Sequence, residues 1–134
     1  MKLLIADDNA AMRALLRHLC ADLTTEIRDC ADGAEAIAAF AEFQPDWTLM
    51  DLAMPGVDGL TAIRRIKTAH PAARILVITH HRSPEYEQAA QSAGACGYVT
   101  KDNLLLLRQL IAGAVQVRDQ NINSNSSNQK ESLL

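Results

Sequence analysis

Four apolar runs in this chain end in polar residues that could act together. Asp7 and Asp8 follow the first run, Asp51 follows a later one, Thr79 ends the next and Lys101 follows the last. Asp51 stands where a bulky, buried strand should stop. A charged residue in that place needs a cation or takes part in chemistry. We therefore expect a reactive carboxylate at Asp51.

Three gathered carboxylates would repel one another unless a positive charge lay among them. Mg²⁺ is the expected cation, because a hard divalent ion prefers oxygen ligands and keeps several waters. With the metal bound, Asp51 can attack an electrophilic phosphorus atom as a nucleophile. The metal, the Lys101 ammonium and the Thr79 hydroxyl would then hold the phosphoryl oxygens. The pattern thus predicts phosphoryl chemistry.

Strand-like and helix-like segments alternate along the chain. Their alternation predicts a doubly wound α/β fold with a five-stranded parallel sheet. In such folds functional residues gather beyond the carboxyl ends of the strands, so the residues named above should meet in space. Strands are expected at residues 2–6, 24–30, 47–50, 75–79 and 94–100, and helices are expected to begin after Asn9, Asp32, Gly59, Ser83 and Asp102.

The first helix carries one apolar stripe suited to packing on a sheet. Arg13 and Arg17 lie outside the stripe and should face solvent. The stripe consists of Met12, Leu15, Leu16, Leu19 and Cys20.

Three other helices have distinctive ends or faces. Asp32 and Glu35 resemble a capping box at the start of a helix over residues 34–43. The unbroken leucines at 104–107, in a helix expected to run to Val117, are wider than one buried stripe and favour a partner contact. The helix after Ser83 should be weakly held, because its inward residues are mostly alanine: Tyr86, Ala89, Ala90 and Ala93.

Length and composition bound the class of protein. With 134 residues, 49% of them hydrophobic, the chain can form one domain with a proper core. Its net charge of −3 argues against free-standing nucleic-acid binding. No apolar run approaches the roughly 20 residues that cross a bilayer. We expect a cytoplasmic protein that does not contact the membrane.

The cysteines and the C-terminal tail suggest no further site. Cys20, Cys30 and Cys96 are odd in number and widely spaced, which is typical of reduced thiols in a core. From Asp119 the composition shifts to Asn, Ser and Gln, which predicts a disordered linker or tail over residues 119–134.

The chain resembles the receiver domains of two-component response regulators. The resemblance covers roughly residues 1–118 and implies a flavodoxin-like and CheY-like (βα)5 fold with strand order 2-1-3-4-5. The runs at 54–60 and 94–102 resemble the NarL/FixJ-like branch, which precedes LuxR-type helix-turn-helix output domains. The matching motifs are Asp7-Asp8, Asp51 with Met54-Pro55-Gly56 behind it, Thr79, Tyr98 and Lys101.

This resemblance implies a role for each motif residue. Asp51 would accept a phosphoryl group from the phosphohistidine of a sensor histidine kinase or a phosphotransfer protein. Asp8, Asp51 and the backbone carbonyl of Ala53 would ligate Mg²⁺, with Asp7 helping mainly through water. Thr79 would swing to a phosphoryl oxygen, Tyr98 would rotate inward behind it and Lys101 would pair with the phosphoryl group.

The resemblance also implies a signalling module rather than an enzyme acting on other substrates. Phosphorylation would switch the surface of helix four, strand five and helix five to control an output partner, through a transcriptional output or a homodimer. DNA would be reached only through an output domain, since no helix-turn-helix follows in this chain.

Two other functions remain open from the residues. One is a phosphatase or phosphotransferase of the haloacid dehalogenase type, although that chemistry wants a second acid where Ala53 stands. The other is a docking or dimerisation domain that works without phosphate. The intact site residues argue against the latter, although His80, which would narrow access to the pocket after Thr79, leaves room for it. In similar receivers, the positions of His81 and Ala53 influence the attack of water on the aspartyl phosphate. A transition-metal site at His80 and His81 lacks a third ligand.

Overall fold

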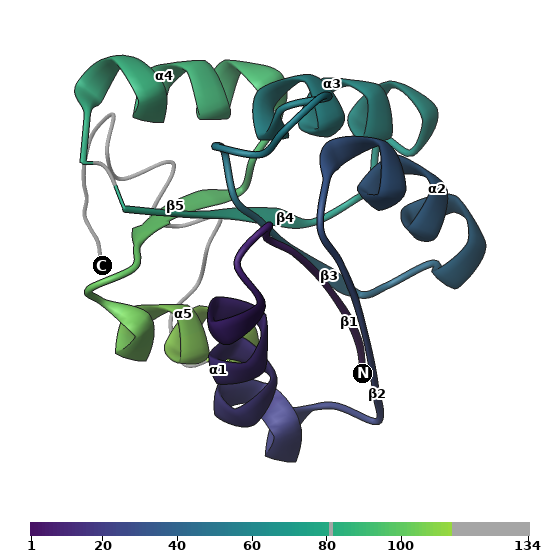
Figure 1. The fold of residues 1–134 in the computed structure, drawn as a ribbon, viewed down its shortest axis with the longest axis vertical. Helices are drawn as coiled ribbons and strands as arrows, with labels where there is room; N and C mark the ends of the chain where they lie inside the picture. Colours follow the sequence, from purple (N-terminus) through teal and green to yellow (C-terminus); the bar gives the residue numbers. More distant parts are fainter. Residues whose placement is uncertain (81, 114–134) are drawn as a thin grey trace, which may run out of the picture.

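The computed structural model describes residues 1–80 and 82–113. Strands and helices alternate strictly, with one short 3-10 helix after the first α-helix (Figure 1). In chain order the elements are β1 (Lys2–Ala6), α1 (Ala10–Cys20), η1 (Ala21–Leu23), β2 (Glu26–Cys30), α2 (Gly33–Phe43), β3 (Trp47–Met50), α3 (Gly59–Ala69), β4 (Ile75–Thr79), α4 (Pro84–Ala93), β5 (Gly97–Thr100) and α5 (Leu104–Ala112).

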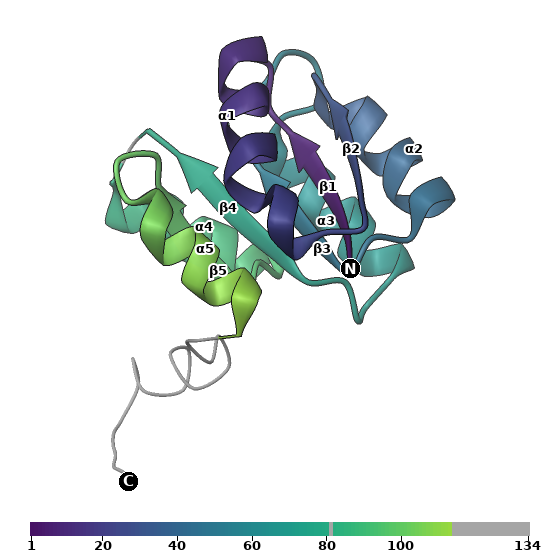
Figure 2. The same ribbon diagram turned by 90° about the horizontal axis from the view of Figure 1, so that it is seen from below.

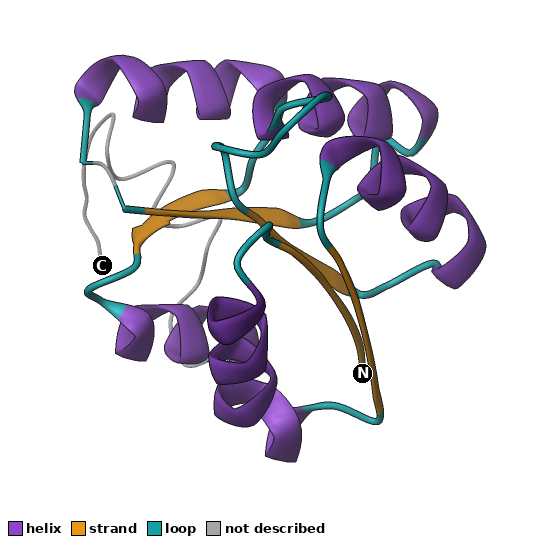
Figure 3. Cartoon of the chain, viewed as in Figure 1, coloured by secondary structure: helices purple, strands orange, loops and turns teal. Residues whose placement is uncertain are grey.

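All five strands pair in parallel, in the order β2-β1-β3-β4-β5. Figures 1 and 3 show the helices in two layers, with α2, α3 and α4 on one face of the sheet and α1 and α5 on the other. In Figure 2, seen from below, α1 and α5 lie in front of the strands. This confirms the predicted doubly wound α/β fold and its strand order. The chain changes direction across the sheet between β1 and β3, so their carboxyl ends mark the switch point.

Each face of the sheet has its own apolar core. Alternate strand residues point to opposite faces, because the side-chain period of a strand is two. Leu4, Met50 and Val77 pack under α2, α3 and α4, together with Phe40 and Ile63. The core on the other face contains chiefly Leu3, Ile5, Leu49 and Ile78 from the strands, and Leu16, Leu107 and Leu110 from the helices.

Side-chain caps fix where the helices begin. Asn9 accepts the N–H of Met12 at 2.9 Å, which confirms the predicted start of α1. The capping box of α2 is also present: the Asp32 carboxylate accepts the N–H of Glu35 at 2.8 Å, and Glu35 accepts the N–H of Ala31 at 2.8 Å. These caps place the helix N-termini beside the sheet edge where the polar residues lie.

Two residues expected to face inward are exposed. Leu15 is 46% exposed, because α1 buries only part of the five-residue stripe, chiefly through Leu16 and Cys20. Tyr86 is 50% exposed, since α4 packs through the buried Ala90 and Ala93 at its C-terminal end. The prediction that alanines form the contact face of α4 is confirmed.

Other predicted boundaries also differ. β2 begins at Glu26 rather than residue 24, after the 3-10 helix η1. α5 begins after Asn103, so Asp102 is not its cap; the Asp102 carboxylate instead accepts the hydroxyl of Thr100. Val117 and the predicted tail at 119–134 lie outside the described residues. Cys20 is buried in the core, and Cys30 and Cys96 are partly buried.

Candidate functional site

Parallel register brings the two acidic strand ends together. Ala6 lies opposite Met50 in the pairing of β1 with β3, so the next residues along, Asp7 and Asp51, are neighbours. The Asp51 N–H donates to the carbonyl of Ala6 at 2.9 Å. Both aspartates are buried, whereas Asp8 is exposed. The predicted meeting of these strand ends is confirmed.

The same register logic places the threonine and the lysine. Thr79 pairs with Thr100, and the Lys101 N–H donates to the carbonyl of Thr79 at 2.7 Å. The Lys101 side chain is 5% exposed and reaches back over the sheet edge. Its Nζ lies 2.8 Å from Oδ2 of Asp7 and 3.7 Å from Oδ2 of Asp51.

Three carboxylates form one compact group. Asp7, Asp8 and Asp51 each offer an oxygen, and these oxygens lie within 4.8 Å of one another. Of the two Asp7 oxygens, Oδ1 accepts the N–H of Asn9 at 2.8 Å, while Oδ2 has the Lys101 ammonium as its ion-pair partner. The N–H of Ala53 donates to Oδ1 of Asp51 at 3.4 Å.

The electrostatics of the group favour a further cation. Burial raises the pKa of Asp51 above its ordinary value, and the negative charge of Asp7 raises it further. Lys101 lowers that pKa but does not cancel the rise. An excess of converging carboxylate oxygens over ammonium groups is the donor set that suits a hard divalent ion. The residues therefore fit Mg²⁺.

Two glycines hold the loop that follows Asp51. A Cβ on Gly59 would lie 2.2 Å from the carbonyl oxygen of Asp51, and one on Gly33 would lie 2.0 Å from that of Val57. Only glycine permits these backbone approaches. The loop that carries Ala53 is thus packed against the N-termini of α2 and α3.

Tyr98 and His80 lie outside the carboxylate group. Tyr98 is on β5 opposite Val77 and packs, half-buried, on the core under α2, α3 and α4. Burial, followed by the charge of Glu87, raises its pKa. His80 is exposed and joins no three-residue group of metal-binding side chains among residues 1–80 and 82–113. His81 lies outside the described residues.

Sequence reasoning missed several residues that shape the site. Asn9 was expected only as a cap, yet its N–H also binds Asp7. Arg13 was expected in solvent, yet its guanidinium donates to the carbonyl of Asp7 at 2.7 Å. Its place one turn after the cap, beside the acidic pair, was the available signal. The close approaches at Gly33 and Gly59 had no local signal.

The fold and site define a flavodoxin-like α/β domain with an acidic centre at the switch point of its sheet. The model of the response regulator receiver domain family matches residues 3–112. The chain belongs to this family. Membership sets aside the haloacid dehalogenase alternative.

The chain is similar to several regulators. It is 37% identical over 119 residues to an uncharacterized transcriptional regulatory protein, YhcZ, of Bacillus subtilis, covering 84% of this chain and 56% of the relative. It is 35% identical to the chemotaxis protein CheY of Halobacterium salinarum, covering 75% and 83%. Among solved structures, a LuxR-family two-component response regulator from Aurantimonas sp. SI85-9A1 has a TM-score of 0.74 at 30% identity, covering 91% of this chain and 98% of that one.

The chain matches only part of some relatives. The chain spans little more than half the length of YhcZ but most of the chemotaxis protein. No helix among the described residues is long and apolar enough to cross a membrane.

Proposed function

We propose that this receiver domain is a phosphorylation-gated signalling module whose acceptor is Asp51. The observation that carries the proposal is the convergence of three carboxylates and a buried lysine at the switch point of the sheet. Family membership supports it, because receiver domains take part in two-component signalling.

Asp8, Asp51 and the backbone carbonyl of Ala53 would hold Mg²⁺, and Asp7 would contribute mainly through water. When bound, the ion supplies positive charge that offsets the carboxylates and the incoming phosphoryl oxygens. Asp7 is the least available as a direct ligand, because Asn9 and Lys101 already engage its two oxygens. Asp8 is exposed and free to turn toward the ion.

The chain's own residues would carry the transfer. A carboxylate oxygen of Asp51 forms a bond to phosphorus while the phosphorus–nitrogen bond of the donor phosphohistidine breaks, and the electron pair leaves with the imidazole nitrogen. Lys101 is already within 3.7 Å of Asp51 and would pair with the transferred group. Thr79, whose carbonyl accepts the N–H of Lys101, would bind a second phosphoryl oxygen through its hydroxyl.

The switch would pass through Thr79 and Tyr98 to the surface formed by α4, β5 and α5. The contact between α4 and its neighbours rests on small alanine side chains, so little apolar area opposes its displacement. The donor would be a sensor histidine kinase or a phosphotransfer protein. A transcriptional output, in keeping with relatives named as transcriptional regulators, would require a separate DNA-binding domain.

Beryllofluoride, which mimics a phosphoryl group on aspartate, tests this switch. In a 15N NMR titration with Mg²⁺ and beryllofluoride, amides at Thr79, Tyr98 and Lys101 should shift in the native chain and not in Asp51→Asn. Asp58→Asn is the matched control, because Asp58 caps α3 outside the carboxylate group. No shift in a folded native chain would contradict the proposal and favour the phosphate-independent docking domain.

A further inference from the structure

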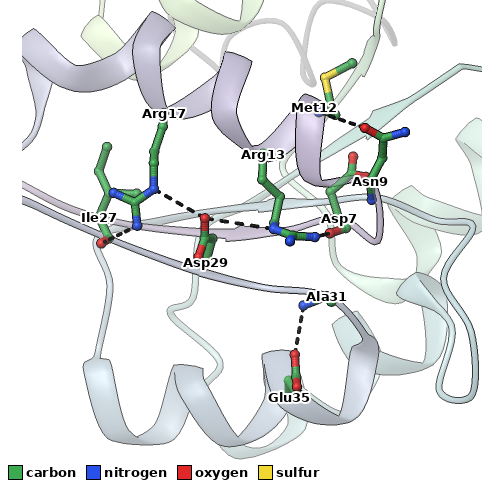
Figure 4. Close-up of polar contacts among 9 residues, drawn as sticks. All are labelled: Asp7, Asn9, Met12, Arg13, Arg17, Ile27, Asp29, Ala31 and Glu35. Carbon is green, nitrogen blue, oxygen red and sulfur yellow. Dashed lines mark hydrogen bonds and ion pairs between the residues drawn. The ribbon is translucent and has the colours of Figure 1, made fainter.

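Arg13 makes a contact from α1 to the backbone of the acidic turn. Its Nη1 donates to the carbonyl oxygen of Asp7 at 2.7 Å, and its Nε lies 3.9 Å from Oδ2 of Asp29, at the end of β2 (Figure 4). The side chain is 22% exposed, so water competes only partly for the guanidinium. Arg13 thus joins α1, the β1 end and the β2 end at one point.

The contact completes the fixation of Asp7. Its N–H donates to the carbonyl of Cys30 at 3.1 Å, its Oδ1 accepts the N–H of Asn9 and its Oδ2 pairs with Lys101. Among the bonds that the described residues give Asp7, the one to its carbonyl comes from Arg13, within α1. A carbonyl held in place fixes the peptide plane between Asp7 and Asp8, and hence the direction in which Asp8 leaves β1.

Arg17 provides an internal comparison, since it lies one turn later on the same face. It shares Asp29 with Arg13, at 3.3 Å, and donates to the carbonyl of Ile27 at 3.2 Å (Figure 4). The part of the chain that the structure describes gives it no bond to the acidic turn. Arg17 therefore has the charge and the β2 anchor of Arg13 without the bond to Asp7.

We propose that Arg13 is a positioning residue that orients the Asp7-Asp8 turn for Mg²⁺. The inference rests on the proposed Mg²⁺ site, and it concerns the apo protein as well as the loaded one. Outer-shell bonds of this kind typically change metal affinity about 10-fold to 100-fold when they are lost. Arg13 holds the turn through one main-chain hydrogen bond and touches neither the ion nor the phosphoryl group.

The direction of the change in Mg²⁺ affinity distinguishes a positioning role of Arg13 from a purely electrostatic one. Removing a positive group near an acidic site should strengthen cation binding, because repulsion between the group and the cation disappears. Loss of positioning should weaken binding instead. Arg13→Met and Arg17→Met each remove one positive charge and one link to Asp29, but only the first removes the bond to Asp7.

The test is a 15N NMR titration of the full chain and both variants with MgCl2. We expect the Mg²⁺ Kd of Arg13→Met to rise about 10-fold, with that of Arg17→Met unchanged or lower. Arg13→Lys should bind more tightly than Arg13→Met, because an ammonium can still reach the Asp7 carbonyl; it also carries the test if Arg13→Met does not fold. In metal-free protein, the Asn9 amide should exchange its hydrogen faster in Arg13→Met than in Arg17→Met.

The outcomes separate the two proposals. If the folded native chain shows no Mg²⁺ binding, the proposed Mg²⁺ site is wrong, and the role of Arg13 is wrong with it. If the native chain binds Mg²⁺ while Arg13→Met binds equally well or more tightly, only the role of Arg13 is overturned. A Kd that rises equally in both methionine variants would also overturn it, since general loosening of α1 would then explain the effect.

Discussion

The ammonium of Lys101 lies 2.8 Å from the carboxylate of Asp7, closer than its 3.7 Å separation from Asp51. The lysine is therefore paired with Asp7, which follows β1, while the charge of the proposed acceptor Asp51, which follows β3, is less compensated. Phosphorylation of Asp51 would require Lys101 to exchange this partner for the phosphoryl group. In the unphosphorylated protein, the Lys101 ammonium is therefore already close enough to Asp51 to make this exchange.

The first prediction concerns pH and stability. The pKa of Asp51 is raised in the fold, so its ionisation destabilises the folded state: the penalty is absent below the unfolded pKa and complete above the folded one. In EDTA, the stability of the native chain relative to Asp51→Asn should fall as pH rises through that window. Urea unfolding between pH 4 and pH 7, an interval set by the ordinary Asp pKa of about 3.9, measures it.

Mg²⁺ is the control for that series. At pH 7, Mg²⁺ should reduce the difference in unfolding free energy between the native chain and Asp51→Asn. The bound cation offsets the carboxylate charges and so stabilises the native chain. A gap that is independent of pH would show that Asp51 is not under electrostatic strain.

A second prediction concerns the effect of the Lys101 charge on the pKa of Asp51. Lys101→Met should raise the pKa of Asp51 further, because the lysine lowers it in the native protein. A 13C NMR titration of the aspartate carboxyl groups reports this directly. Lys67→Met is the comparison, since Lys67 binds the carbonyls of Pro71 and Ala73 and should leave Asp51 unchanged. An unchanged Asp51 pKa in Lys101→Met would contradict the electrostatic interaction between Lys101 and Asp51.

A third prediction tests the loop after Asp51. Gly33→Ala should cost about 3 kcal/mol of unfolding free energy, because its Cβ would overlap the Val57 backbone and force a shift. Gly56→Ala should cost only about 1 kcal/mol: its φ is +70°, but nothing lies within 4 Å of the new Cβ. Chemical denaturation orders the two, and equal costs would argue against the packing of this loop on α2.

A fourth prediction concerns the core away from the site. The hydroxyl of Thr48 is fully buried on β3, between Leu4 and Ile75, and has no hydrogen-bond partner among the described residues. Thr48→Val should stabilise the protein by about 1 kcal/mol, because it removes an unsatisfied polar group at nearly constant shape. Thr68→Val should give no such gain, since its exposed hydroxyl already binds the Arg64 carbonyl at 2.8 Å. Thermal unfolding of both variants measures this difference, and an equal change in stability in the two would contradict the prediction.

Much of the fold could be predicted, because its determinants are local. Apolar runs and caps such as Asn9 and Ser83 identify strands and helix starts within a few residues. The predicted cap of α5 was wrong by one residue: the helix begins after Asn103, and the Asp102 carboxylate accepts the hydroxyl of Thr100 instead. The exposure of Leu15 depends on how far α1 overlaps the sheet, which periodicity alone does not determine.

The sequence was enough to predict which residues gather at the site, but not which of them form ion pairs and hydrogen bonds with one another. Strand ends in a parallel sheet meet at one edge, so the positions of Asp7, Asp51 and Lys101 in the sequence were enough to gather them. Which carboxylate Lys101 would pair with depends on side-chain reach across three strands. The bond from Arg13 to Asp7 likewise depends on how α1 crosses β1, which the position of Arg13 one turn after the cap suggests but does not determine.

Intact mass is the most direct test that Asp51 accepts a phosphoryl group. The native chain, Asp51→Asn and Asp58→Asn are incubated with phosphoramidate in Mg²⁺ or in EDTA. We predict the mass gain of one phosphoryl group in the native chain and in Asp58→Asn with Mg²⁺, and none in Asp51→Asn or in EDTA. An equal gain in Asp51→Asn, or no gain in the folded native chain with Mg²⁺, would contradict the assignment of Asp51 as the acceptor.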